Sequence, residues 1–153
     1  STYCQAYAEE KGKNIDFTHC SSYGPNPDKG VSFVAPGNGI PIIHETSGGI
    51  EFKYGRGTSF SAPLFAGMVL IALYAFTNGW FAAGGTPASL LLKIPMGSQI
   101  DDIFKSVSSR SSWDMRMGWG YVHLQQLYQY AYELGRNSVP QGGGGSGSWQ
   151  FLG

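Results

Sequence analysis

The sequence predicts a mixed α/β fold, and three observations lead to this class. Short runs of β-branched and aromatic residues bounded by glycine and proline are typical of strands, as in residues 31–35 and 50–54. A long apolar run at residues 62–76 has no polar face, which predicts a buried helix. Two later segments, residues 100–107 and 123–134, place apolar residues at helical spacing.

The first part of the chain predicts short elements separated by turns. Residues 1–14 predict a short helix ended by Gly12, and residues 15–18 predict a short strand. Residues 21–30 consist of turn-forming residues. The strand expected at residues 31–35 then stops at a proline-glycine loop.

A second pair of strands is expected after this loop. Residues 40–45 predict a strand in which Pro41 favours an edge or a bulge, because proline cannot donate to a sheet ladder. A turn at residues 47–49 leads to residues 50–54, where apolar and polar residues alternate. This pattern predicts a half-exposed strand that delivers the chain to Gly57.

The segment from Gly57 onward is the organising feature of the sequence. Glycine permits a sharp turn, two hydroxyl residues follow it, and Pro63 fits the first turn of a helix, where N–H groups have no intrahelical partner. Ser59 therefore stands at a helix N-terminus, which favours negative charge. This position suits a nucleophile whose reaction develops an oxyanion. The alternative is that Ser59 only caps the helix.

The distribution of charge gives no indication of nucleic-acid binding but raises the question of a membrane span. The formal net charge is zero and no basic stripe is present, so nothing indicates nucleic-acid binding. No charged residue occurs between Arg56 and Lys93, which raises the possibility of a membrane span. Residues 62–76 are too short to cross a bilayer, and residues 77–79 are expected to interrupt the run. A buried core helix is favoured, and a membrane anchor at residues 60–83 is the alternative.

The C-terminal part predicts further helices beyond a glycine-proline break at residues 84–87. The expected elements are a short helix at residues 88–92 ended by Pro95, a helix at residues 100–107 capped by Ser98, a strand at residues 118–122, and a helix at residues 123–134 closed by Gly135. Residues 141–148 have the composition of a flexible linker. We therefore expect one domain at residues 1–140, followed by a linker or tail at residues 141–153.

The string from Gly57 to Gly67 closely resembles the nucleophile motif of subtilisin-like serine peptidases, Gly-Thr-Ser-x-x-x-Pro-x-x-Ala-Gly. Residues 21–25, the Ala35-Pro36-Gly37 loop and the Gly-x-Gly-x-Val pattern at residues 118–122 resemble the same family. The resemblance implies a parallel central sheet flanked by helices, with Ser59 attacking peptide carbonyls to form an acyl-enzyme. It also implies oxyanion support from Thr58, peptide or protein substrates, no required cofactor, and an extracellular or secretory location.

The resemblance places the acid and the histidine upstream of the serine. Only His19 and His44 precede Ser59, with Asp16 and Asp28 as possible acids. Neither histidine lies in the sequence setting that the family shows, and the upstream oxyanion asparagine is also missing.

We therefore expect the C-terminal part of a catalytic domain, inactive alone, whose partner is the N-terminal part. The chain starts without a methionine, which also suggests a fragment or a processed product. In this fragment residues 64–76 should be partly uncovered. The two cysteines, Cys4 and Cys20, could pair or remain free.

A related family is the runner-up. Residues 112–120 and the Asp101-Asp102 pair resemble the sedolisins, serine-carboxyl peptidases of the same fold. That resemblance implies a structural calcium ion with Asp102 as ligand, although the expected glycine-rich ligand loop is missing. The Ala35-Pro36-Gly37 loop favours the subtilisin side. A non-catalytic member that serves as a binding module is a further alternative.

Overall fold

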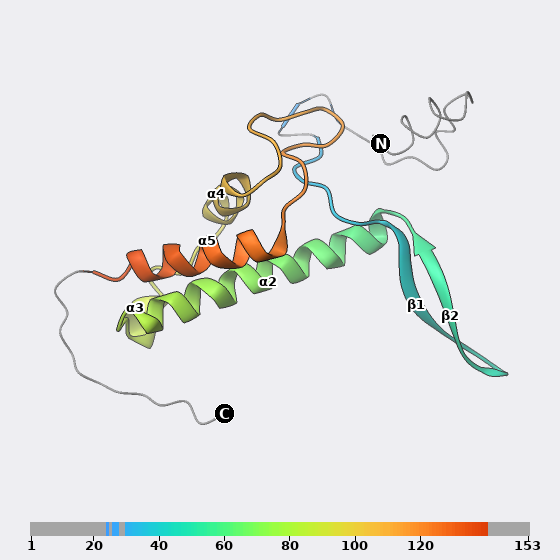
Figure 1. Cartoon of the computed structure of the whole chain (residues 1–153), viewed down its shortest axis with the longest axis horizontal. Helices are drawn as coiled ribbons and strands as arrows, with labels where there is room; N and C mark the ends of the chain where they lie inside the picture. Colours follow the sequence, from blue (N-terminus) through green and yellow to red (C-terminus); the bar gives the residue numbers. More distant parts are fainter. Residues whose placement is uncertain (1–23, 25, 28–29, 141–153) are drawn as a thin grey trace. The chain divides into compact units, whose positions relative to one another are not determined.

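The computed structural model describes residue 24, residues 26–27 and residues 30–140 (Figure 1). In chain order the elements are β1 (Asn38–Thr46), β2 (Gly49–Arg56), α2 (Thr58–Ala82), α3 (Pro87–Leu90), α4 (Ser98–Ser106) and α5 (Leu124–Asn137). The expectations for residues 1–14, 15–18 and 141–153, and for the two cysteines, lie outside the described residues.

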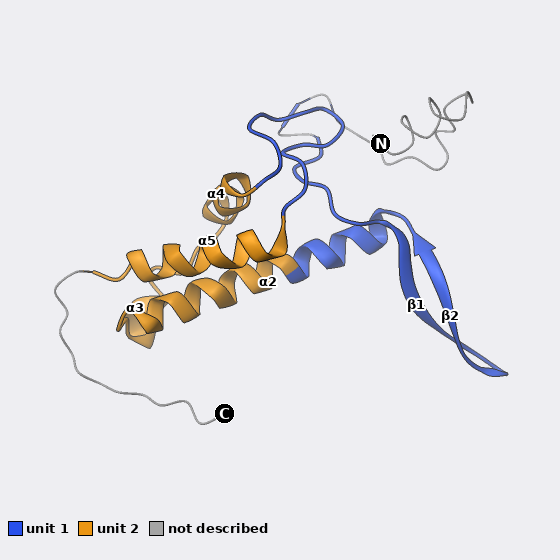
Figure 2. Cartoon of the chain, in the orientation of Figure 1, with its two compact units in different colours: residues 1–67, 108–122 blue, residues 68–107, 123–153 orange. Residues whose placement is uncertain are grey.

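The chain divides into two compact units (Figure 2). The hairpin unit contains the described residues up to 67 together with residues 108–122. The helical unit contains residues 68–107 and residues 123–140. α2 begins in the hairpin unit and continues into the helical unit.

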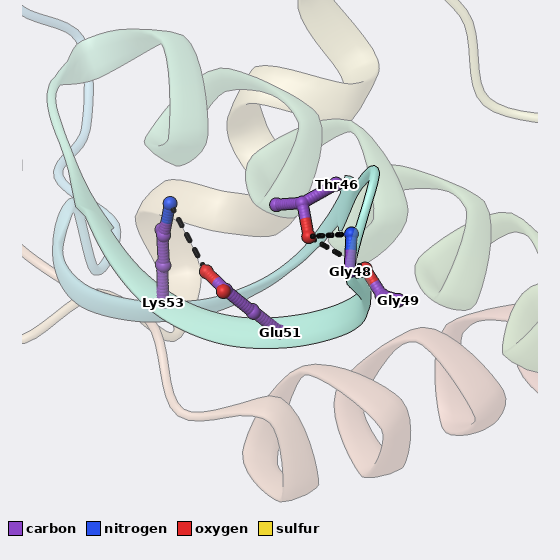
Figure 3. A network of polar contacts seen from close by, with 5 residues as sticks. All are labelled: Thr46, Gly48, Gly49, Glu51 and Lys53. Carbon is purple, nitrogen blue, oxygen red and sulfur yellow. Dashed lines mark hydrogen bonds and ion pairs between the residues drawn. The ribbon is translucent and has the colours of Figure 1, made fainter.

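β1 and β2 form an antiparallel hairpin that confirms both predicted strands and the turn between them. The Thr46 hydroxyl closes the turn, because it donates to the Gly49 carbonyl at 3.1 Å and accepts the Gly48 N–H at 3.2 Å (Figure 3). The register shifts between Asn38 and Ile40, which is the bulge expected beside Pro41.

The exposure of this hairpin differs from the prediction. β2 was expected to be half-exposed, yet Ile50, Phe52 and Tyr54 are between 69% and 81% exposed, and so is their neighbour Ile43. The alternation is real, but no described element covers the apolar face.

The parallel central sheet is not found within the described part of the chain, where the one sheet is antiparallel. The tight turn between β1 and β2 explains this, since a parallel pair needs a crossover of a dozen residues or more.

The segments expected as strands at residues 31–35 and 118–122 are not regular strands either. They are joined by two backbone hydrogen bonds. Trp119 donates to Ser32 at 2.8 Å, and Val34 donates to Gly120 at 2.9 Å. The two segments therefore advance in the same direction.

Residues 113–118 make further contacts with the 31–35 segment. The Trp113 indole N–H donates to the carbonyl of Val31 at 2.9 Å. Gly118 has a positive φ of 61°, and a Cβ there would overlap the backbone of Val31 and Ser32. Glycine is thus required at this close approach.

α2 runs unbroken to Ala82, so the interruption expected at residues 77–79 was wrong. α5 likewise runs through Gly135, which was expected to close it. Both glycines serve helix packing. A Cβ on Gly79 would overlap the Tyr132 carbonyl, and a Cβ on Gly135 would overlap the Phe76 carbonyl. The two helices therefore pass antiparallel at backbone contact.

One core cluster of the helical unit lies where α2 ends. It contains Phe76, Trp80 and Leu90, and the residues packed against them are Ile94, Leu134 and Val139. Phe104, Leu127 and Ala131 of the same unit are also fully buried. The Trp80 indole N–H donates to the Thr86 carbonyl at 3.1 Å, which ties the predicted glycine-proline break to the core.

The short helices of this unit follow the sequence closely. Thr86 and Ser89 form a capping box at α3, which confirms the helix expected there. At α4 the N-cap is Gly97 and not Ser98, because Ser98 is already helical. The helix was predicted correctly, and its observed N-cap lies one residue before the expected one.

α2 carries the exposed apolar surface that was predicted for residues 64–76. Leu70 and Tyr74 are 67% and 62% exposed, and Leu64 is also exposed. By length and composition α2 is apolar and long enough to cross a membrane. This corrects the estimate made from residues 62–76 alone, although core helices of soluble proteins meet the same criterion.

Candidate active site

Ser59 lies in the first turn of α2, and both Ser59 and Thr58 are exposed. Gly57 makes the turn with a φ of 136°, a backbone conformation that residues other than glycine rarely adopt. The Phe60 N–H donates to the Gly57 carbonyl at 3.1 Å, which starts the helix. Among the described residues the Ser59 hydroxyl makes no capping hydrogen bond, so the capping alternative gains no support.

A loop twenty residues upstream holds this turn in place. The Gly57 N–H donates to the carbonyl oxygen of Gly37 at 2.7 Å. Gly37 also packs directly on Ser61, because a Cβ at Gly37 would overlap the Ser61 hydroxyl. The Ala35-Pro36-Gly37 loop is therefore a structural support of the helix N-terminus.

Aromatic side chains brace the same region. The Phe60 ring lies against the backbone of Gly55, where any Cβ would clash with it. Phe33 stacks on Phe65 with ring centroids 5.4 Å apart. The first two turns of α2 are thus packed against β2 on one side and against the 31–35 segment on another.

The local charges favour an anion in front of Ser59. The first turn of α2 contains no acidic residue. The partial positive charge of its unpaired N–H groups is therefore not neutralised by a neighbouring carboxylate. Arg56 is exposed at the end of β2. On the hairpin, the Lys53 ammonium is instead paired with Glu51 at 3.4 Å (Figure 3).

His44, the candidate base that the structure describes, does not lie beside Ser59. His44 is exposed on β1 and pairs in register with Glu51. Glu51 lies five residues before Arg56, which is about 17 Å along an extended strand, so His44 is at the far end of the hairpin from Ser59. The other candidates, His19, Asp16 and Asp28, lie outside the described residues.

Asp102 is the ligand that the sedolisin resemblance implies for a structural calcium ion. Asp102 is exposed on α4, and its carboxylate lies 3.7 Å from the Lys105 ammonium. Within the described part of the chain, no three histidine, cysteine or acidic residues gather closely enough to hold a metal ion.

Asp114 is the acid with a clear structural role. Its Oδ1 accepts the N–H groups of Arg116 and Met117 at 2.9 and 3.0 Å. These two backbone hydrogen bonds, helped by the nearby Arg110 guanidinium, lower the pKa of the Asp114 carboxyl below its ordinary value. Asp114 thus fixes the turn that presents Gly118 to the 31–35 segment.

Sequence reasoning identified Ser59 and Thr58 but missed two neighbours. It treated Gly37 only as part of a loop motif, and it assigned no role to Arg56. The signal for Arg56 was present, because it is the only charged residue between Lys53 and Lys93.

Comparison with protein families gives one match. The model of the subtilase family matches residues 7–120. This range contains the Gly37 loop, the Ser59 turn and the segment at residues 118–120. Neither the comparison with curated proteins nor the comparison with solved structures gave a match.

Proposed function

The chain belongs to the subtilase family of serine peptidases, and we propose that Ser59 is its nucleophile. The observation that carries the proposal is the position of Ser59. It is exposed at the start of α2, in a turn that the hydrogen bond from Gly57 to Gly37 fixes. In this position the Ser59 hydroxyl is exposed to solvent and, within the part of the chain that the structure describes, is not used to accept a hydrogen bond from a backbone N–H.

The proposed reaction is peptide-bond hydrolysis in two stages. A base removes the Ser59 proton while the hydroxyl oxygen attacks the peptide carbonyl, and the proton passes to the leaving amine as the C–N bond breaks. Water then hydrolyses the acyl-enzyme and returns the proton to Ser59. The Ser59 N–H and the Thr58 hydroxyl support the oxyanion from the positive end of α2.

The base and its orienting acid come from an N-terminal segment of the same domain. We propose that this chain is the C-terminal part of the domain and is inactive alone. The exposed Leu70 and Tyr74 on α2 support a missing covering part. Two backbone hydrogen bonds join residues 32–34 to residues 119–120 with both segments running in the same direction, which supports a parallel central sheet in the complete domain.

In this account α2 is an interior helix and not a membrane anchor. The enzyme acts on peptides or proteins, with neither nucleic acid nor a membrane as partner, and its chemistry requires no cofactor. We place it in the extracellular or secretory compartment.

Hydrolysis of a labelled protein substrate by the full-length protein tests the proposal. Ser59→Ala should lower kcat by about a thousandfold or more. Ser47→Ala, which removes an exposed hydroxyl from the hairpin turn, is the matched control and should keep full activity.

The alternatives predict different results. A sedolisin-type peptidase would keep its activity when each upstream histidine is replaced by alanine, and would lose it when an upstream glutamate is replaced. A non-catalytic binding module would show no hydrolysis that depends on Ser59.

A further inference from the structure

Arg56 is an exposed cation three residues before the proposed nucleophile, and the proposed hydrolysis steps do not use it. It is the last residue of β2 and pairs in register with Asn38, which is uncharged. Within residue 24, residues 26–27 and residues 30–140, Arg56 makes no ion pair. No acidic residue occurs in the sequence between Glu51 and Asp101.

The backbone holds Arg56 close to Ser59. Three Cα–Cα steps of about 3.8 Å separate the two residues, so their Cα atoms lie within about 11 Å of each other. The turn between them is fixed by the positive φ of Gly57 and by its hydrogen bond to Gly37. The exposed Arg56 side chain therefore begins close to the Ser59 turn, and among the described residues no ion pair holds its guanidinium away from that turn.

The neighbouring charge on β2 behaves differently. Successive residues of a strand point to opposite faces, so Arg56 shares a face with Tyr54 while Lys53 is on the other. Lys53 is already paired with Glu51. Of the two cations on β2, Arg56 is therefore the one without an ion pair in the described part of the chain, and its charge adds to the positive end of α2.

We propose that Arg56 is a specificity-determining residue that selects peptide substrates with an acidic side chain next to the scissile bond. A carboxylate is the group that a guanidinium binds best, through paired N–H donors. Peptides with a basic residue in that position would be repelled by the same charge. This inference rests on the proposed peptidase function and names its substrate class.

Matched peptides test the preference in the full-length protein. Quenched fluorescent peptides that differ only in Asp, Asn or Lys at each position flanking the cleaved bond should show a kcat/KM for Asp about fivefold above that for Asn at one position. Arg56→Gln should remove this ratio, Arg56→Lys should keep part of it, and Arg56→Glu should shift the preference to Lys. Raising the salt concentration should shrink the ratio.

Lys53→Gln is the matched control, because it removes a charge from the opposite face of the same strand. It should leave the Asp-to-Asn ratio unchanged. An equal ratio in wild type and Arg56→Gln, or an equal loss in Lys53→Gln, overturns the inference while the peptidase function stands.

A binding measurement separates the inference from the chemistry. Fluorescence anisotropy measures the affinity of the Ser59→Ala protein for the same Asp and Asn peptides, and this measurement does not require hydrolysis. Tighter binding of the Asp peptide that Arg56→Gln abolishes supports the role of Arg56 even if hydrolysis fails. Indistinguishable affinities of the Asp and Asn peptides contradict it.

Discussion

The N–H of Gly57 donates a hydrogen bond to the carbonyl oxygen of Gly37 across 2.7 Å. This bond joins the proline-glycine loop to the turn that presents Ser59, and Ser61 packs on the same glycine. The position of the proposed nucleophile therefore depends on Gly37, which lies twenty-two positions upstream of Ser59.

Gly37→Ala should disturb this turn. The new Cβ would overlap the Ser61 hydroxyl and lie 3.1 Å from the Gly57 carbonyl oxygen. We expect kcat of the full-length protein to fall at least about tenfold, because a small misplacement of a nucleophile is costly. Adding Ser61→Ala removes the main clash and should restore part of the activity.

Gly48→Ala is the control for that experiment. Gly48 lies in the exposed turn between β1 and β2, and a Cβ there would meet only the Thr46 hydroxyl, at an ordinary contact distance of 3.7 Å. Alanine at this position should leave kcat of the full-length protein unchanged. A Gly37→Ala protein as active as Gly48→Ala would contradict the role given to Gly37.

Gly79→Ala and Gly135→Ala should each destabilise the helical unit. Each Cβ would overlap a backbone carbonyl of the facing helix, at Tyr132 and at Phe76. Forcing the helices apart should cost about 1–3 kcal/mol, which exceeds the helix-propensity gain of alanine. Urea unfolding measures this cost, and stabilised proteins would show that the helices do not touch here.

The same two glycines show what the sequence could not reveal. In the sequence, a glycine at either position predicts an interruption or the end of a helix. In the structure both glycines lie inside helices. Their role depends on the other helix, which is distant in sequence. The Ser59 turn was predictable because glycine, hydroxyl residues and proline are local signals, whereas the partner of Gly57 was not.

The sheet was misjudged for a related reason. Residues 31–35 have the composition of a strand, but strand pairing requires a neighbour with free backbone groups along its length. Within the described residues the 31–35 segment finds only two such bonds, to Trp119 and Gly120. The β1–β2 hairpin needed no distant partner, and the sequence predicted it correctly.

Asp114→Asn should change how stability depends on pH. The pKa of Asp114 is lowered in the folded protein, so its contribution is present above the ordinary carboxyl pKa and is lost as the pH falls through the folded value. As the pH falls below about 4, the free energy of unfolding should therefore fall less steeply in the variant than in wild type. If urea unfolding shows the same decrease in the free energy of unfolding with falling pH for both proteins, the prediction is contradicted.

Leu70→Lys combined with Tyr74→Lys should make this chain more soluble when it is expressed alone. Both side chains are exposed on α2, and exposed apolar surface promotes association. Light scattering should show less aggregation than for wild type. In the full-length protein the same change should abolish activity, because we propose that this surface is covered there. Full activity would mean that the surface stays open.

The most direct test of the central claim is labelling of the full-length protein with a fluorophosphonate, followed by peptide mapping. The account predicts one modified serine, Ser59, and no labelling of the Ser59→Ala variant. A label on any other residue, or full hydrolytic activity in Ser59→Ala, would show that the exposed hydroxyl at the start of α2 is not the nucleophile.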